Sequence, residues 1–141
     1  MNTNNRRRLL KVLPWALFSL FVFVAVFTHA KEPLFFAEGP LSAGKPVFWL
    51  LFIGFLAYGI YCSQKENIFK TLDSIWPFHW ARQIGLDLYL GVVISCFLIY
   101  LVEGSFIVLA FWLLPILLFA NLATLLYVAL NYQTIVTFFV A

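Results

Sequence analysis

An acid and an amide interrupt the most apolar stretches of this chain. Asp87 lies in "QIGLDLYLGVVISC", residues 83–96, and Asn121 lies in "FWLLPILLFANLATLLYVALNY", residues 111–132. A carboxylate in hydrocarbon is costly, and polar side chains inside membranes usually face a bundle interior and pair there. An asparagine amide donates to an ionised carboxylate or accepts from a protonated one. The two residues are therefore the first candidates for a polar site.

The spacing of the two residues supports a pair. A tight turn, "EGS", is centred on Gly104, and Asp87 and Asn121 each lie 17 residues from that glycine. In a helical hairpin both would lie about 25 Å from the turn, at 1.5 Å per residue. We expect them to face each other within hydrogen-bond reach, directly or through one water. Two interpretations stay open: a structural staple, or the lining of a pocket for a proton, cation or lipid-like molecule.

Other polar residues are expected near this pair or at the membrane surface. The predicted polar core also includes Thr124, Tyr127, Tyr58 and Ser19. In "WPFHWARQ", His79 and Arg82 are candidates for contact with a lipid headgroup, although anchoring at the membrane interface is the favoured explanation of this segment. A membrane enzyme acting on isoprenoids would need acid–base and orienting groups, and the available set is Asp87, Tyr58, Asn121 and Tyr127.

The sequence lacks the residue patterns of several common metal, redox and catalytic sites. His29 and His79 are expected at opposite membrane faces, so they cannot jointly ligate a haem or a metal. Cys62 and Cys96 form no C-x-x-C motif and are expected to be apolar packing residues. No glycine-rich phosphate loop and no Ser-His-Asp set occurs. We therefore expect no metal and no cofactor, and no catalytic residue can be assigned.

The composition predicts a membrane protein. Of the 141 residues, 64% are hydrophobic and only 11% are charged, whereas soluble chains are about half apolar and a quarter charged. Four continuous apolar segments, at about 12–28, 47–62, 84–102 and 106–130, are long enough or nearly so to cross roughly 30 Å of hydrocarbon. Residues 1–141 are thus predicted to form a single integral membrane domain, an all-α bundle of four transmembrane helices.

The loop between the second and third segments has its own periodicity. In "ENIFKTLDSIW" the apolar residues recur at helical spacing, and Pro77 follows. This pattern predicts a short interfacial helix resting on the bilayer.

The positive residues predict an orientation. Four precede the first segment and three lie between the second and third: Arg6, Arg7, Arg8, Lys11, Lys65, Lys70 and Arg82. Only Lys31 and Lys45 lie in the opposite loop. By the positive-inside rule, both termini would face the cytoplasm, in a bacterial inner (cytoplasmic) membrane. A cleaved signal peptide ending near Ala30 is the alternative to an uncleaved first span.

The same features limit the possible partners and functions. A basic run beside an apolar helix is a topology signal rather than a nucleic-acid site, so we expect membrane lipid, and a membrane-protein partner or a homo-oligomer. The leading hypothesis is an accessory or lipid-like-ligand-binding membrane component with its site at Asp87 and Asn121. A small isomerase or cyclase acting on an isoprenoid or lipid is the alternative. A small proton-coupled exporter ranks third.

Residues 87–132 resemble a family of small, uncharacterised multi-helix membrane proteins of plants and bacteria. The likeness rests on "DLY" at residue 87, "YLVEGS" at the turn and the long apolar segment after it. In that segment Trp112 is followed eight residues later by Ala120 and Asn121, then by Thr124 and Tyr127. The family usually has a lysine before the turn glutamate and Gly-Ser in place of Ala-Asn. The resemblance implies several membrane helices and no established activity.

Overall fold

The chain is helical throughout most of the residues described by the computed structural model, which are 2–29, 32–39 and 41–140. The elements are α1 (Thr3–Thr28), α2 (Gly44–Lys65), α3 (Ile68–Ile75), α4 (His79–Glu103), α5 (Phe106–Phe119), α6 (Asn121–Leu130) and α7 (Tyr132–Val140). The predicted all-α class is therefore confirmed. The cleavage residue Ala30 and the loop lysine Lys31, both named from the sequence, lie outside the described residues.

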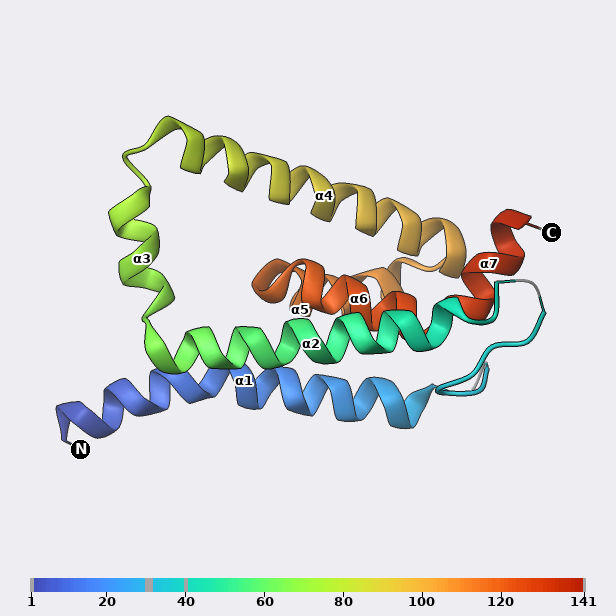
Figure 1. Cartoon of the computed structure of the whole chain (residues 1–141), viewed down its shortest axis with the longest axis horizontal. Helices are drawn as coiled ribbons and strands as arrows, with labels where there is room; N and C mark the ends of the chain where they lie inside the picture. The colour runs from blue at the N-terminus through green and yellow to red at the C-terminus, as the bar shows by residue number, and fades with distance from the viewer. Residues whose placement is uncertain (1, 30–31, 40, 141) are drawn as a thin grey trace.

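Three helices are long and apolar enough to cross a membrane: α1, α2 and α4, with 26, 22 and 25 residues. They correspond to the first three predicted segments, and α2 begins at Gly44, three residues before the bound of 47 given from the sequence. In Figure 1, α1 lies along α2, and α5 and α6 lie between α2 and α4. Helices of this length exceed the roughly 30 Å of a bilayer core at 1.5 Å per residue.

The predicted fourth span is not a single helix. It breaks at Ala120, whose φ of 47° and ψ of −114° lie outside helical geometry, and α6 then turns back along α5. The rings of Trp112 and Tyr127 pack with centroids 5.1 Å apart, whereas one straight helix would separate these residues by about 22 Å. The expected bundle of four continuous transmembrane helices is therefore not confirmed.

Proline does not explain the break. Pro115 lies within α5, which continues to Phe119, and the chain turns only at Ala120, five residues after the proline. Ala120 has only a methyl side chain, which limits the steric cost of its positive φ. Among the described residues, a fourth stretch meets the same length and composition only if α6 and α7 count as one, and these two helices are bent by 77° at Asn131.

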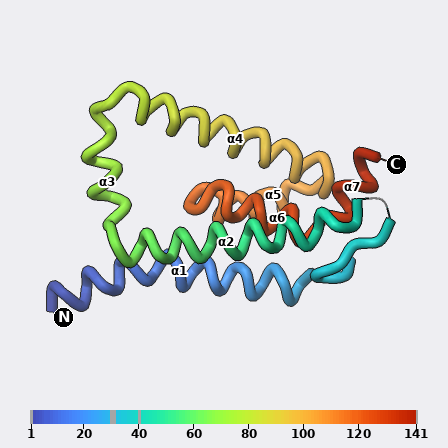
Figure 2. The backbone as a smooth tube through the Cα atoms, in the orientation of Figure 1, coloured from blue at the N-terminus to red at the C-terminus, as the bar shows by residue number. Residues whose placement is uncertain are grey.

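The fold-back gives the molecule two distinct ends. At the α3 end, α3 runs across the bundle between the last turn of α2 and the first turn of α4, near the N-terminus (Figure 2). At the α7 end lie the loop of residues 32–43 and the C-terminal helix (Figure 1). The start of α1 and the end of α7 thus lie at opposite ends of the bundle (Figure 1). The side of the membrane that each terminus faces stays a prediction.

The short helix predicted between the second and third spans is confirmed as α3. Its N-cap residue, Asn67, accepts a hydrogen bond from the backbone N–H of Phe69 at 3.0 Å through its side-chain oxygen. Its apolar residues are exposed, with Phe69 70% and Leu72 45% accessible. An amphipathic helix with an uncovered apolar side has the character of an interfacial helix.

The most buried element is α6. Six of its ten residues are buried: Leu122, Ala123, Leu126, Tyr127, Ala129 and Leu130. Helix α1 joins this core through Phe18, whose ring packs 4.6 Å from that of Phe119. At the α3 end, the indole N–H of Trp15 donates to Ser63 of α2 at 2.9 Å. The core is therefore built around the returning limb of the α5–α6 hairpin.

Candidate functional site

Asp87 and Asn121 line the same hollow. It has a volume of about 470 Å³, and its other lining residues are Ile84, Leu88, Leu90, Gly91 and Ile94. Asp87 lies eight residues after His79, where α4 starts, which is about 12 Å along the helix. Asn121 is the first residue after the hairpin break, at the tip that points toward the α3 end (Figure 1). The hairpin therefore carries Asn121 to the depth of Asp87.

The two side chains do not form the expected hydrogen bond. Both are exposed, and in the part of the chain that the structure describes neither makes a side-chain hydrogen bond or ion pair. A direct staple between α4 and α6 is therefore absent from this arrangement. What remains is a carboxyl group and an amide at the edge of one mostly apolar hollow.

The nearest basic residue along α4 is engaged elsewhere. Arg82 donates through Nε to the carbonyl of Trp76 at 3.0 Å, and through a terminal nitrogen to that of Pro77 at 3.1 Å. These bonds close the turn between α3 and α4. Arg82 and His79 are both exposed at the α3 end, and neither lines the hollow.

Tyr127 and Thr124 make their hydrogen bonds with partners other than Asp87. Tyr127 is fully buried, and its hydroxyl donates to the carboxylate of Glu103 at 3.0 Å. Because Glu103 is the last residue of α4, this contact lies at the opposite end of α4 from Asp87. Thr124 donates within its own helix, to the carbonyl of Ala120 at 3.3 Å. The expectation that Tyr127 joins a polar core around Asp87 is therefore not met, and the place of Thr124 in such a core stays a prediction.

Ser19 and Tyr58 also fall outside the hollow. Both are exposed, Tyr58 to 64%, and the ring of Tyr58 stacks on that of Tyr61. The acid–base set that an enzyme would need is thus not assembled around Asp87. Among the described residues, no three histidine, cysteine, aspartate or glutamate side chains gather as metal ligands.

A second polar cluster lies at the α7 end, where the sequence indicated only a loop. Glu32 and Lys45 form an ion pair whose side chains are 4% and 0% exposed. The carboxylate of Glu32 also accepts from the backbone N–H groups of Gln133 at 3.1 Å and Thr134 at 2.9 Å, and from the Thr134 hydroxyl at 2.9 Å. Lys45 donates in addition to the carbonyl of Leu130 at 3.3 Å.

These contacts satisfy two helix ends at once. The N–H groups of Gln133 and Thr134 lie in the first turn of α7, and the carbonyl of Leu130 ends α6. Backbone groups at helix ends have no partner within their own helix, and a carboxylate suits the N-terminus as an ammonium suits the C-terminus. We call this set of five residues, Glu32, Lys45, Leu130, Gln133 and Thr134, the clasp. It holds the bend between α6 and α7.

The clasp also sets the ionisation of Glu32. Burial alone would raise the pKa of its carboxyl group, but the Lys45 ammonium and the donors of α7 outweigh burial and hold the pKa below its ordinary value of 4.5. Glu32 therefore stays ionised in the folded chain at neutral pH.

Close packing surrounds the clasp. Tyr132 donates to the carbonyl of Leu41 at 2.7 Å, and Gly44 lies so close that an added Cβ would be 1.9 Å from the Tyr132 hydroxyl oxygen. Asn131, which is buried, donates to the carbonyl of Tyr127 at 3.1 Å. The start of α2 and the bend of α6–α7 therefore fit together only because residue 44 has no side chain.

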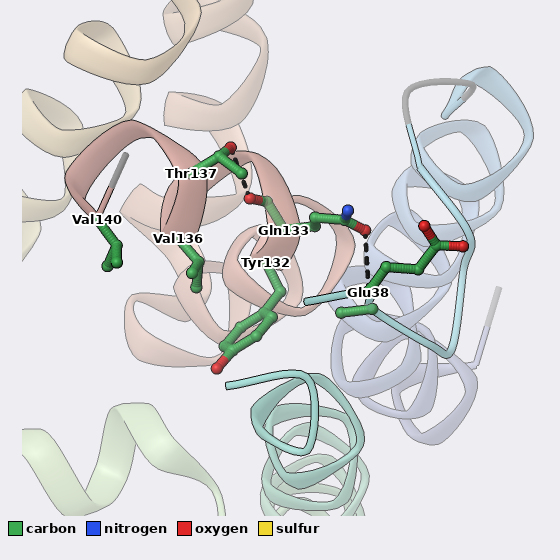
Figure 3. Close-up of a pocket in the computed structure, with 7 residues that line it drawn as sticks. Glu38, Tyr132, Gln133, Val136, Thr137 and Val140 are labelled. Atoms are coloured by element: carbon green, nitrogen blue, oxygen red, sulfur yellow. Dashed lines mark hydrogen bonds between the residues drawn. The ribbon is translucent and has the colours of Figure 1, made fainter. Parts of the chain in front are cut away.

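A smaller pocket of about 230 Å³ adjoins the clasp, between α7 and the loop that contains Glu38. Figure 3 shows the Gln133 side chain accepting from the backbone N–H of Glu38, and the Thr137 hydroxyl donating to the Gln133 carbonyl. The Glu38 carboxylate points away from Val136 and Val140 (Figure 3). The polar groups here bind one another, so this pocket belongs to the packing of the clasp.

Sequence reasoning missed the clasp because each member looks ordinary by itself. Glu32 and Lys45 resemble two loop charges, and only the return of α6 brings residues 130–134 to them. One signal was present: an acid and a base flank a loop rich in proline and glycine, beside an apolar helix start.

Comparison with known proteins adds no family to these observations. Neither the protein-family models, nor the curated proteins, nor the solved structures contain a match to this chain. The resemblance of residues 87–132 to a small membrane-protein family stays a prediction.

Proposed function

We propose that this chain is an integral membrane protein that binds a lipid-like molecule, with the molecule's polar group at Asp87 and Asn121. One observation carries the proposal: these two polar side chains, free of side-chain hydrogen bonds within the described residues, line one otherwise apolar hollow. Ligand sites are typically apolar with a few polar groups that fix orientation, and measure about 300–1,000 Å³. The hollow has a volume of about 470 Å³ and is open on its outer side, so a bound molecule would lie partly in the surrounding lipid.

The cost of leaving Asp87 without a partner supports a ligand. A carboxylate at the centre of a membrane helix costs about 2.5–3.5 kcal/mol on insertion scales. Asp87 lies short of the centre of α4, so it costs less than this, but acids within membrane helices usually pair or mark a pathway. Arg82 and Tyr127, which could have served as partners, are engaged elsewhere. A bound polar group would supply the partner that the chain does not.

The charge distribution supports an orientation in a bacterial inner membrane. The start of α1, the end of α2, all of α3 and the first turn of α4 belong to the α3 end, and these segments carry the seven positive residues named above. At the α7 end, Lys45 is buried in the clasp. By the positive-inside rule the α3 end faces the cytoplasm, so we propose that the C-terminal helix lies on the opposite side, with α3 resting on the cytoplasmic surface.

The competing functions receive less support. An enzyme acting on isoprenoids would need Tyr58 and Tyr127 near Asp87, and these residues lie elsewhere. A proton-coupled exporter would use Asp87 to carry the proton. An assay of proton-coupled transport tests this alternative. An accessory subunit would use the exposed apolar faces and would not need the hollow.

The proposal is tested by the lipids that accompany the purified protein. The protein is extracted with a membrane-solubilising copolymer, and its bound lipids are quantified by mass spectrometry in wild type, Asp87→Leu and Asn121→Leu. Hydrogen bonds to charged groups contribute about 1.5–3 kcal/mol, so Asp87→Leu should lower retention of one lipid-like species at least about tenfold. Ser95→Ala, which removes a hydroxyl bonded only within α4, is the matched control. Equal lipid content in all four proteins would contradict the proposal.

A further inference from the structure

The charges around the hollow select the ligand's headgroup. Its seven lining residues include one acid, Asp87, one amide, Asn121, and no basic side chain. We propose that the hollow takes an amphiphile whose headgroup is a cationic amine. This inference rests on the function proposed above and narrows it to one class of ligand.

The positive charge nearest to Asp87 along α4 does not neutralise the site. Arg82 lies five residues before Asp87, about 7.5 Å along the helix axis, and its guanidinium is bonded to the carbonyls of Trp76 and Pro77. Lys45 is paired with Glu32 in the clasp, at the other end of the bundle. The Asp87 carboxyl group therefore has no counter-ion among its described neighbours, and the ligand must supply one.

An ammonium group matches both polar side chains. It has three hydrogens to donate and accepts none, so it can donate to the Asp87 carboxylate and to the Asn121 carbonyl oxygen together. A carboxylate or phosphate headgroup would find one amide donor and a nearby like charge, which costs free energy in a medium of low dielectric constant. An alcohol headgroup could donate a hydrogen bond to the Asp87 carboxylate, but it would lack the attraction between opposite charges.

The apolar lining accommodates the adjoining hydrocarbon. Ile84, Leu88, Leu90 and Ile94 come from successive turns of α4, so they extend the hollow along the helix. Gly91 leaves room in the hollow, because a methyl group added at this glycine would have no atom within 4 Å apart from its chain neighbours and the adjacent backbone of its own helix. An alkyl chain attached to the ammonium would follow these residues into the surrounding lipid.

Three probes with the same chain length test this preference. Dodecylamine, dodecanol and dodecanoate are titrated into the purified full-length protein in lipid nanodiscs at pH 7, where the amine is protonated and the acid ionised. Binding to wild type is compared with Asp87→Asn, which keeps the shape and removes the charge. Asp73→Asn, in exposed α3, neutralises an acid outside the hollow and is the matched control.

We expect dodecylamine to bind wild type and Asp73→Asn at least about tenfold more tightly than dodecanoate, and Asp87→Asn to lose that advantage. Dodecanoate binding as tightly as the amine, or amine binding unchanged in Asp87→Asn, would overturn the inference. Asp87-dependent binding of dodecanol or dodecanoate alone would overturn only the headgroup assignment. Binding of none of the three probes would count against both this inference and the proposed function. Helical content by circular dichroism checks that Asp87→Asn is folded.

Discussion

Glu32 and Lys45, 13 residues apart in the chain, form a buried ion pair that fixes the 77° bend between α6 and α7. Glu32 binds the start of α7 and Lys45 binds the end of α6. Neither residue belongs to either helix. The shape of the C-terminal region thus depends on two charges supplied by the loop before α2 and by the first turn of α2.

Removing either charge should destabilise the fold. A buried ion left without its partner typically costs about 3–5 kcal/mol, so Glu32→Leu and Lys45→Met should each lower the free energy of unfolding by an amount of this order. The double variant should lose less than the sum of the two, because it leaves no uncompensated charge. Chemical unfolding in detergent measures all three. Lys70→Met, on the exposed face of α3, should change stability by no more than about 0.5 kcal/mol.

The clasp should make stability depend on pH in the acid range. Since the folded pKa of Glu32 lies below its ordinary value of 4.5, its contribution is fully present above about pH 4.5 and is lost as the pH falls through the folded pKa. The melting temperature, measured from pH 7 to pH 3, should therefore fall below about pH 4.5. In the Glu32→Gln variant this fall should be smaller, and an equally steep fall would show that other carboxyl groups dominate.

Gly44→Ala should destabilise the protein although alanine favours helices. The new methyl group would lie 1.9 Å from the Tyr132 hydroxyl oxygen, which is held by the Leu41 carbonyl. Overpacking of this kind costs about 1–3 kcal/mol. Gly54→Ala, in the same helix with no atom within 4 Å of the added carbon, should instead be neutral or slightly stabilising. Equal melting temperatures for the two variants would argue against the close contact.

Asp87→Leu should leave the folded state as stable as wild type, or make it more stable. Asp87 makes no side-chain hydrogen bond within the described residues, so its removal breaks none, and leucine inserts into lipid more favourably. Thermal unfolding of lipid-stripped protein measures this. A loss of about 0.6–1.7 kcal/mol, the range found for hydrogen bonds between membrane helices, would instead indicate a staple.

Local patterns predicted much of this architecture. The length of the continuous apolar segments predicted α1, α2 and α4, and the helical spacing of apolar residues predicted α3. Counting from Gly104 brought Asn121 to Asp87 because the count requires only that α4 and α5 run antiparallel. The count therefore gives the same result whether the chain crosses the membrane after Asn121 or turns back there.

The break at Ala120 and the clasp could not be predicted, because residues 106–130 are apolar with little interruption. Residues 106–130 read as one span, since neither Ala120 nor Asn121 is a strong helix breaker and the obvious candidate, Pro115, lies within an intact helix. Tyr127 was therefore placed beside Asp87, when the fold-back takes it to Glu103. The clasp forms because of the same fold-back. The charges at the two ends of the loop before α2 do not by themselves indicate that residues 130–134 are their partners.

The hollow and the clasp both depend on the fold-back at Ala120, and the side on which α7 lies tests it most directly. Single cysteines are placed at Thr137 in α7 and at Ser74 in α3, both exposed, after Cys62 and Cys96 are replaced by alanine. Intact cells are treated with a membrane-impermeant maleimide, before and after permeabilisation, with Glu38→Cys as the control for the loop at the α7 end. The fold-back predicts that Thr137→Cys reacts in intact cells, like Glu38→Cys, while Ser74→Cys reacts only after permeabilisation. Protection of Thr137→Cys until permeabilisation, together with a reactive Glu38→Cys, would show that the chain crosses the membrane after residue 106, and would contradict it.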